Sequence, residues 1–573
     1  MMNVKKYTTT YDKYPEKQVL GYEAFDGWDG ILQELRKACS TGVIVAEFYP
    51  GVESDAIVRQ LSRLGATMFS AEACALSKEQ YKNAISPFLT EDRVFGVMNT
   101  LRLEDVYCAD RIVDMRSQLL EAEGLKIVYG TGASLVVEGD VIVYFDMSRW
   151  EMQCRYRRGA SNWHTDNPDE DYLKKFKQGY FVEWRMADRQ KRKLLSKIDY
   201  IVDTIHTDEP KMVSGDAFRT GLEMFAREPF RLVPYFAPEV WGGQWMKEVC
   251  DLPRDAENYA WAFDGVPEEN SIMMRFGTVR MEFPAVDVVF YRPRQLLGEK
   301  VHARFGDEFP IRFDFLDTMG GQNLSLQVHP LTEYIQNTFG MHYTQDESYY
   351  ILDCAENTNV YLGLKENIDK DEMLSELQEA QNGGTPFDAE RFVNKWPVKK
   401  HDHLLIPAGT IHCSGANTMV LEISATPYIF TFKLWDWGRL GLDGKPRPVH
   451  IEHGKHVIAW DRTTAWVKEN LIDQAKVLSE NSECKVEKTG LHEREFIETR
   501  RYTLSGKTLC ESNGSVSMCN VVDGNGVIIS SPDGAFEPFV AHYAETFIIP
   551  GSAEKFEFEP LSDSCMILRA TVR

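Results

Sequence analysis

The 573-residue sequence lacks most of the features that mark secreted, membrane or nucleic-acid-binding proteins. Its 11 cysteines are scattered from Cys39 to Cys565 without a CxxC pair, so we expect reduced thiols and a cytoplasmic protein. The opening MMNVKKYTTTYDKYPEK has no apolar signal core, and no apolar run is long enough to span a bilayer. A formal net charge of −23 argues against nucleic acid or an anionic membrane as a partner, although local Lys and Arg could still bind a small anion.

The length of the chain predicts more than one domain. A chain of 573 residues is too long for one typical core, and 43% hydrophobic residues leave ample material to bury. Up to about residue 225, strand-like and helix-like segments alternate, which predicts a domain built on a parallel α/β sheet. The strand candidates are residues 41–49, 125–129 and 140–145, and the helix candidates are residues 55–64 and the charged run 184–197, which we expect to be exposed.

From about residue 230 onward, short β-rich segments are separated by Gly, Pro and Asn, which predicts a sandwich or barrel. One helical insertion, at residues 370–380, interrupts them. The segment HLLIPAGTIH (403–412) has an echo in ETFIIPGSAEKFEF (545–558), where no His takes the place of His412. We therefore predict two related β-barrel units, of which only the first holds a metal. The predicted domains are residues 1–225, 226–470 and 471–573.

The segment NLSLQVHP carries the most informative chemical signal. Alternate side chains of a β-strand share a face, so Ser325, Gln327 and His329 point one way. Glu347 opens a second strand candidate, ESYYIL, and His412 follows the turn PAGT. Two imidazoles, a carboxylate and an amide oxygen, spread over roughly 85 residues, are suitable ligands for a divalent metal. We predict that the side chains of Gln327, His329, Glu347 and His412 form a metal site.

The remaining histidines are weaker candidates. His401 and His403 flank the entrance of a strand, and we expect them to be solvated. His450, His453 and His456 could suggest a second metal cluster, but a loop of surface histidines is the preferred interpretation.

Five longer motifs follow one another in the C-terminal part: FLDTMGGQNLSLQVHP, DESYYILDC, LLIPAGTIHCSG, MVLEIS and KLWDWGRLGLDGKPRPVHI. PAGTIH alone is generic to cupins, but in this order and spacing the five motifs resemble the type I phosphomannose isomerases, which are cupin enzymes. The resemblance covers about residues 230–573 and implies a double cupin (jelly-roll) fold. It also implies that the four metal ligands, normally of zinc, correspond to Gln327, His329, Glu347 and His412.

The resemblance implies an aldose–ketose isomerase that interconverts mannose 6-phosphate and fructose 6-phosphate through an enediolate. This chemistry needs an electrophile for the developing oxyanion, a base near the first two carbons, and cations for the phosphate. Arg439 matches an arginine that the family places at the active site, and a surface ion pair is the alternative. Glu422 is a candidate base or a partner of a metal ligand. The other candidates are Ser325, which would line the cavity, and Lys433, where related isomerases tend to have arginine.

The sequence departs from the family at two positions. The family commonly has a lysine two residues before the glutamate ligand, where this chain has Gln345. A second lysine often precedes the Leu-Asp element, where this chain has Asp314. Either lysine could supply positive charge or proton transfer in related enzymes. Arg312 could place a compensating charge nearby if its side chain faces inward.

The N-terminal part resembles a degenerate nucleotide kinase. IVAEFYPGVESDAIVRQL has the strand, turn and helix of a phosphate-binding loop but lacks the Gly-Lys-Ser/Thr ending. YGTGAS (129–134) resembles a glycine loop, and a tight turn is the alternative. DVIVYFDMSRWEMQCRYRRG looks like the arginine-rich segment of small nucleotide kinases, which could bind a nucleotide or phosphate; a solvated basic helix is the alternative. Its arginines are Arg149, Arg155, Arg157 and Arg158.

Three functions remain open from the sequence. The first is a zinc-dependent isomerase of sugar phosphates, favoured by the intact ligand set and Arg439. The second is a regulatory protein that senses sugar phosphates with an inactive metal cupin, favoured by the two missing lysines. The third is another metal cupin such as a ferrous oxygenase, because two His and one carboxylate can also hold iron. The glutamine ligand and the extended motifs argue against the third.

Overall fold

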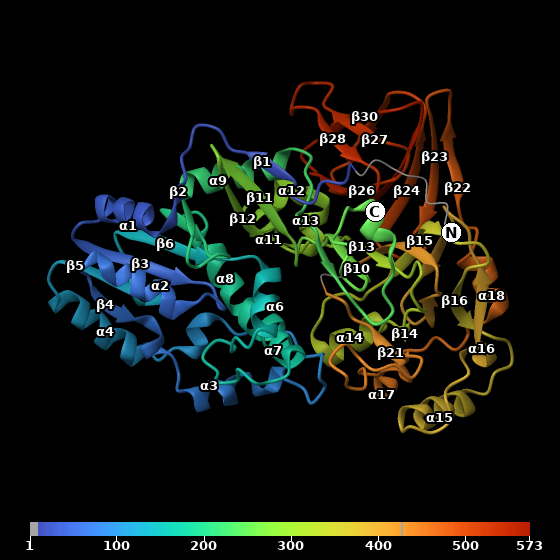
Figure 1. The fold of residues 1–573 in the computed structure, drawn as a ribbon, viewed down its shortest axis with the longest axis horizontal. Helices are drawn as coiled ribbons and strands as arrows, with labels where there is room; N and C mark the ends of the chain where they lie inside the picture. The colour runs from blue at the N-terminus through green and yellow to red at the C-terminus, as the bar shows by residue number, and fades with distance from the viewer. Residues whose placement is uncertain (1–9, 426–427) are drawn as a thin grey trace.

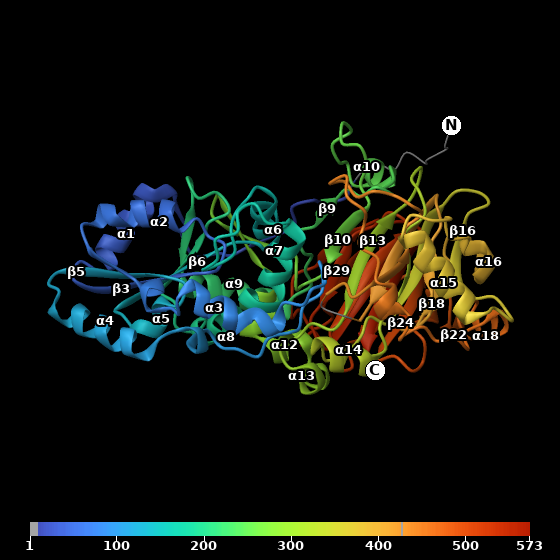
Figure 2. The ribbon, with the colours of Figure 1, turned by 90° about the horizontal axis from the view of Figure 1, so that it is seen from below.

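The computed structural model describes residues 10–425 and 428–573. An α/β part and a β-rich part lie next to each other along the long axis of the molecule (Figures 1 and 2). This arrangement confirms the predicted fold class, an α/β domain followed by antiparallel β-sheets. Within the described residues, no helix combines the length and the apolar character that a bilayer crossing requires.

A mostly parallel sheet of seven strands forms the centre of the N-terminal part, in the order β2-β8-β7-β6-β3-β5-β4. The strand candidates at residues 41–49, 125–129 and 140–145 become β3, β5 and β6. The middle of β3 is an unbroken apolar run because helices cover both faces of a parallel sheet. The strands are β2 (Phe25–Asp26), β3 (Gly42–Phe48), β4 (Thr67–Ser70), β5 (Leu125–Gly130), β6 (Val141–Asp146), β7 (Tyr200–Asp203) and β8 (Lys211–Ser214).

Helices pack on this sheet through apolar stripes. In α1 the buried residues Trp28, Ile31, Leu32 and Leu35 recur at three- and four-residue spacing, as expected for one face of a helix. The helices are α1 (Gly27–Ala38), α2 (Ser54–Leu61), α3 (Lys78–Ile85), α4 (Ala109–Glu121), α5 (Ala133–Val136), α6 (Arg149–Arg157), α7 (Tyr172–Gln178), α8 (Trp184–Leu194) and α9 (Gly215–Arg227).

The burial of helix α8 contradicts the prediction from the sequence. We expected the charged run 184–197 to be an exposed helix, but seven of the eleven residues of α8 are buried. Lys191 lies between two buried carboxylates, 2.5 Å from Asp146 and 2.6 Å from Asp287. The charges are therefore satisfied by ion pairs with residues far away in the sequence, and a helix that pairs its charges in this way can be buried.

The first β-barrel unit is built from two sheets, β18-β15-β20-β13-β10-β9 and β17-β16-β19-β14-β21. In the first sheet Glu422 lies directly opposite both Tyr349 and Asp314, so these side chains share one face. The strands are β9 (Tyr235–Ala237), β10 (Trp261–Gly265), β13 (Arg312–Asp317), β14 (Leu326–Val328), β15 (Glu347–Cys354), β16 (Asn359–Leu364), β17 (Val393–Pro397), β18 (His403–Ile406), β19 (His412–Ser414), β20 (Thr418–Ser424) and β21 (Phe432–Trp435).

The chain from the first barrel strand to the second barrel unit also forms short helices, of which α11 and α12 pack on α9. The predicted insertion forms α15, whose N-cap Asp369 accepts hydrogen bonds from the backbone N–H groups of Asp371 and Glu372. The helices are α10 (Trp245–Val249), α11 (Val286–Tyr291), α12 (Pro293–Leu297), α13 (Glu299–Phe305), α14 (Thr332–Phe339), α15 (Lys370–Gln381), α16 (Ala389–Phe392), α17 (Ile451–Gly454) and α18 (Thr464–Asn470).

The second barrel unit again has two sheets, β22-β23-β24-β31-β26-β29 and β25-β30-β27-β28. The repeat seen in the sequence has a structural counterpart, because β29 and β30 flank the Pro-Gly turn as β18 and β19 flank PAGT. The strands are β22 (Lys476–Glu480), β23 (Cys484–Gly490), β24 (Ile497–Leu504), β25 (Thr508–Glu511), β26 (Ser517–Asp523), β27 (Gly526–Ser530), β28 (Phe539–His542), β29 (Thr546–Ile549), β30 (Lys555–Pro560) and β31 (Cys565–Val572).

A small sheet of three strands joins the start of the chain to its middle. Strand β1 (Glu16–Gln18) pairs in parallel with β11 (Ser271–Phe276), which pairs with β12 (Val279–Pro284). An ion pair of 2.7 Å between Glu16 and Arg275 reinforces the β1–β11 contact, and Lys17 pairs with Glu228 at the end of α9.

Candidate metal centre

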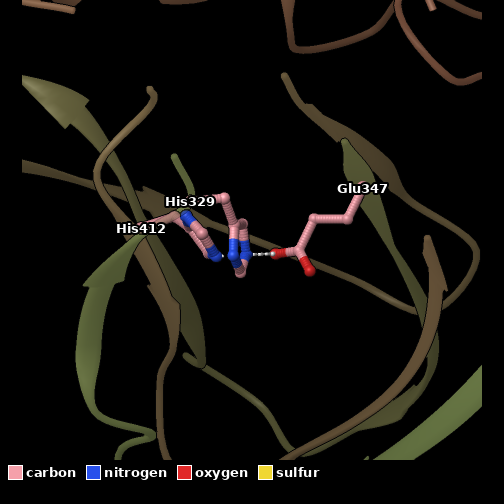
Figure 3. Close-up of side chains that lie close together, drawn as sticks. All are labelled: His329, Glu347 and His412. Atoms are coloured by element: carbon pink, nitrogen blue, oxygen red, sulfur yellow. Dashed lines mark ion pairs between the residues drawn. The ribbon is translucent and has the colours of Figure 1, made fainter. Parts of the chain in front are cut away.

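Three predicted ligands converge inside the first barrel (Figure 3). His329 directly follows β14, His412 opens β19, and Glu347 opens β15 in the facing sheet. Gln327 lies opposite His412 in the β14–β19 pairing. All four side chains are buried. Each ligand stands at or next to a strand end, so the two sheets hold the site from opposite sides.

The Glu347 carboxylate faces both imidazoles. Its Oε1 atom lies 2.6 Å from His412 Nε2 and 3.1 Å from His329 Nε2. The other ring nitrogens face backbone carbonyls: His329 Nδ1 lies 2.8 Å from Phe430 O, and His412 Nδ1 lies 2.9 Å from Thr410 O. A carbonyl only accepts, so each Nδ1 must carry a hydrogen, and an imidazole in its neutral form then turns the lone pair of Nε2 toward the carboxylate.

This donor set fits a divalent cation. Two lone pairs and a carboxylate oxygen that face one another in a buried space repel unless a positive charge lies among them. Outer hydrogen bonds from the ring N–H to a carbonyl are also the usual way in which metal-binding histidines are oriented. His329, Glu347 and His412 could therefore hold a metal ion.

Gln327 extends the ligand set. Its amide nitrogen lies 3.2 Å from His412 Nε2. A half-turn of the amide would bring the oxygen to the same position, and the two orientations differ little in shape. The fourth predicted ligand thus lies beside the other three.

Gln345 connects the metal centre to a second carboxyl group. Its Nε2 atom donates to Glu347 and to Glu422, each at 3.1 Å, and its Oε1 atom accepts from the backbone N–H of Phe430. Burial raises the pKa of Glu422 well above its usual range, and the carboxylates of Glu347 and Asp314 raise it further. Both effects favour the protonated form of Glu422 beside the site.

Arg312 faces inward, as the sequence allowed. It stands opposite Ser424 with the same parity as Asp314, and it is buried. Its Nε donates to Asp314 at 2.5 Å, and Nη1 lies 3.5 Å from Glu269. Neither Nη atom makes a hydrogen bond to a described residue. Burial raises the pKa of Asp314 to about 6, although the neighbouring Arg312 lowers it.

Arg439 and Ser325 meet on one carboxylate, Asp436. Ser325 donates to Asp436 at 2.7 Å and Arg439 at 2.6 Å, while Arg439 also donates to the carbonyl of Asn323. Arg447, which the sequence analysis missed, lies 2.9 Å from the same carboxylate. The ion pair that was the alternative role of Arg439 is therefore present, but it is largely buried and does not lie at the surface.

Lys433 occupies the neighbouring strand position. It lies opposite Gln327 in the β14–β21 pairing, so its side chain is on the same face as that ligand. Burial lowers the pKa of Lys433 to about 8, and the nearby Arg447 lowers it as well. An amine with this pKa changes its charge close to neutral pH.

The histidines outside the site were partly misjudged. His403 is buried and lies 2.8 Å from the Ser348 hydroxyl, and His450 is buried beside Phe95. We expected solvated or surface positions. Gly490 of β23 packs against the His403 ring, and Phe95 of the N-terminal part packs against His450, and neither neighbour is visible in the local sequence.

The predicted phosphate loops of the N-terminal part are filled by the chain's own side chains. In the glycine loop, the Glu47 carboxylate accepts from the N–H groups of Gly132 at 2.6 Å and Ser134 at 2.7 Å, where an external anion would bind. In the other loop, Arg155 donates to the carbonyl of Gly51. An anion is therefore already present at the first loop.

The four predicted arginines are also engaged. Arg149 pairs with Asp188 and Glu268, at 2.8 and 2.6 Å. Arg155 and Arg158 share Glu151. Arg157 lies over the rings of Trp150 and Tyr172, each with the centroid 5.1 Å away.

Residues 27–227 match a family described as a domain of unknown function (DUF8485). The mannose-6-phosphate isomerase ManA of Bacillus subtilis is 24% identical over 307 residues, which are 53% of this chain and 88% of the relative. The mannose-6-phosphate isomerase of Streptococcus mutans is 23% identical over 338 residues, 58% of this chain and 95% of the relative.

A crystal structure of the mannose 6-phosphate isomerase from Bacillus subtilis has the same fold as the β-rich part. It matches with a TM-score of 0.50 and 18% identity, and covers 60% of this chain and 99% of that chain. The C-terminal part of the chain therefore resembles the mannose-6-phosphate isomerases at a distance, and it follows an N-terminal domain of unknown function.

Proposed function

We propose that the first barrel is a metal-dependent aldose–ketose isomerase that interconverts mannose 6-phosphate and fructose 6-phosphate. The observation that carries the proposal is the buried cluster of two imidazole Nε2 atoms around one carboxylate oxygen. The relatives' names support the substrate class. Zinc is the proposed metal, because imidazole and carboxylate ligands suit it.

The proposed metal ligands are Gln327, His329, Glu347 and His412. A divalent cation held there would supply an electrophile for the oxyanion that develops on the sugar. Glu422 would carry the proton between the first two carbons, taking it up as a carboxylate and returning it as an acid, since a raised pKa makes the carboxylate a stronger base. Gln345 would hold Glu422 in place.

The proposed substrate-binding groups lie around Asp436. Arg439, Lys433 and Ser325 would bind the phosphate and the sugar hydroxyls, with Arg447 as a further cation at the same carboxylate. Arg312 would supply inside the barrel the positive charge that the family's lysines give elsewhere, because its two Nη atoms lack hydrogen bonds within the described residues.

A second candidate is a regulatory protein that binds sugar phosphates without turnover. Gln345 and Asp314 favour this candidate, because neither side chain can replace the positive charge of a lysine. Both amide atoms of Gln345 also form hydrogen bonds within the protein. The kinase-like origin of the N-terminal domain and its nucleotide ligand stay predictions. The internal partners of Glu47 and Arg155 argue against phosphate at those loops.

A coupled assay of mannose 6-phosphate conversion tests the proposal. The protein should be purified, loaded with Zn²⁺ and compared with His329→Ala and His412→Ala. Both variants should lose the metal and the turnover. His342→Ala, whose ring is exposed and pairs with Glu308, is the matched control and should keep both. Tight sugar-phosphate binding without turnover in the metal-loaded protein would favour the regulatory candidate instead.

A further inference from the structure

A cavity of about 320 Å³ lies at one end of the second barrel unit. Its walls come from β24, β31, the segment 512–515 and α13. Arg500 and Arg569 stand opposite each other in the β24–β31 pairing, two residues from the pair Tyr502 and Ile567. That second pair belongs to the apolar core of the barrel. Because alternate residues share a face, the two arginines continue the inner face of the barrel to its mouth.

The cavity is short of negative charge. Four cations line it, and only one carboxylate, Glu498, lies among them, although the chain as a whole carries a formal charge of −23. Like charges directly opposite each other in a sheet are destabilising. Lys488 stands opposite Arg500 on the other side and adds a third cation to the row. The lining cations are Lys300, Arg500, Arg569 and Arg573.

Arg569 is the buried member of this set of lining cations. It is 5% exposed, and its guanidinium donates to the Ser517 hydroxyl, the Tyr502 hydroxyl and the carbonyl of Glu511. These acceptors are all neutral. Within the described residues no carboxylate pairs with Arg569. A buried charge without a counter-charge is costly, so the site favours an anion.

The single lining carboxylate, that of Glu498, cannot balance the four lining cations. Glu498 pairs with Arg500 at 2.6 Å, and lies 3.6 Å from Lys488 and 3.9 Å from Arg573. Among the described residues, the one hydrogen-bond acceptor of Lys300 is the carbonyl of Val572, at 3.5 Å. The lining therefore carries a formal surplus of three positive charges, four cations less one carboxylate.

We propose that the mouth of the second barrel binds the phosphate group of a small metabolite, or phosphate itself. A phosphate dianion suits both the surplus charge and the planar forks of guanidinium groups. The hydroxyls of Ser512 and Ser515 line the same cavity, whose volume is that of a small-ligand site. The site lies in the barrel without the metal triad, so it goes beyond the proposed isomerase and does not depend on it.

Titration of the full-length protein with inorganic phosphate, at constant ionic strength against chloride, tests the proposal. Calorimetry should find saturable binding that Arg500→Gln and Lys300→Gln each weaken by about tenfold or more, the effect of losing one charge-assisted hydrogen bond. Lys507→Gln, an exposed cation of the same unit that pairs with Glu557, is the control and should bind phosphate as the wild type does. Glucose 6-phosphate is the second probe. If it binds more tightly than inorganic phosphate, the ligand is a phosphate ester, and if the two bind equally, the site recognises the phosphate group alone.

Two further measurements separate phosphate binding at this cavity from binding at the metal centre and from a loss of folding. His329→Ala should bind phosphate as the wild type does. In phosphate-free buffer, Arg500→Gln should unfold within a few degrees of the wild type, because it removes the like-charge contact with Arg569 together with the ion pair to Glu498, and phosphate should raise its Tm less. Unchanged phosphate affinity in both cavity variants would overturn the proposal, and so would loss of binding in His329→Ala.

Discussion

The ring of Phe95 stacks on the ring of Phe430, with centroids 4.5 Å apart and planes at 16°. Phe95 belongs to the N-terminal part, whereas Phe430 lies between β20 and β21 of the first barrel. The backbone of Phe430 orients two side chains of the candidate metal centre, since its carbonyl accepts from His329 and its N–H donates to Gln345. The N-terminal domain thus contacts the residue whose carbonyl orients His329, a candidate metal ligand.

The Phe95→Ala variant tests this coupling. Removing a buried phenyl ring should lower the free energy of unfolding by about 3–5 kcal/mol. It should also weaken zinc affinity by about 10–100-fold, because the carbonyl that orients His329 loses its packing. Chelator competition measures the affinity. Phe218→Ala is the matched control, because its ring is equally buried and packs on Phe283 far from the centre. Equal zinc affinity in the two variants would disprove the coupling.

Glu422→Gln separates proton transfer from structure. Since the raised pKa favours the neutral form of Glu422, the amide is close to it in charge and should change the free energy of unfolding by less than about 1.5 kcal/mol. Zinc should remain bound, while kcat should fall by about 10²–10⁴-fold with little change in KM. Glu282→Gln, which replaces another buried carboxyl group with a pKa of about 7, should keep kcat. An unaltered kcat in Glu422→Gln would mean that Glu422 only holds its neighbours in place.

Lys191→Met tests the buried ion triad that the sequence did not reveal. The change leaves the carboxylates of Asp146 and Asp287 buried without a cation, so unfolding by urea should show a loss of about 3–5 kcal/mol. Lys193 lies on the same helix and pairs with Glu104 at the surface. The Lys193→Met variant should therefore lower the free energy of unfolding by less than about 1 kcal/mol. Adding Asp146→Asn and Asp287→Asn to Lys191→Met should restore part of the loss. Similar losses in the two single variants would contradict the assignment.

His403 predicts a pH dependence of stability. Burial lowers its pKa to about 3, and Arg501 lowers it further, whereas an unfolded imidazole has a pKa of about 6.5. Between these values the unfolded state binds a proton that the folded state does not, so stability falls as the pH falls, by about 1.4 kcal/mol per unit. From pH 7.5 to 5.0 the loss should be about 2 kcal/mol.

His403→Gln is the comparison for this effect, because glutamine can bond to the Ser348 hydroxyl without titrating. Urea unfolding at both pH values, with a chelator present so that metal release does not contribute, gives the difference between wild type and variant. The difference should shrink toward acid pH. A constant difference would exclude His403 as the titrating group.

The sequence predicts the metal cluster because a strand repeats every two residues. Gln327 and His329 had to share a face wherever the strand lay, and the turn before His412 had to return the chain to the barrel. The order of the motifs supplied the rest. Local pattern and distant resemblance agreed, and the geometry brings the four side chains together.

What the sequence could not predict depends on contacts across long stretches of chain. Lys191 meets Asp287 across 96 residues, and a charged helix with such partners looks like a solvated one. Arg447 lies in a Gly- and Pro-rich stretch without periodicity, so nothing tied it to Asp436. Phe95 lies in a loop whose partner, Phe430, is provided by the other half of the molecule.

The short parallel strand β1 limits how the chain can be divided. Its three residues pair with Met273, Met274 and Arg275 of β11. A fragment that started after α9 would leave that edge of β11 with unpaired N–H and C=O groups, open to other chains. The barrels are therefore best produced together with the first residues of the protein, as one piece.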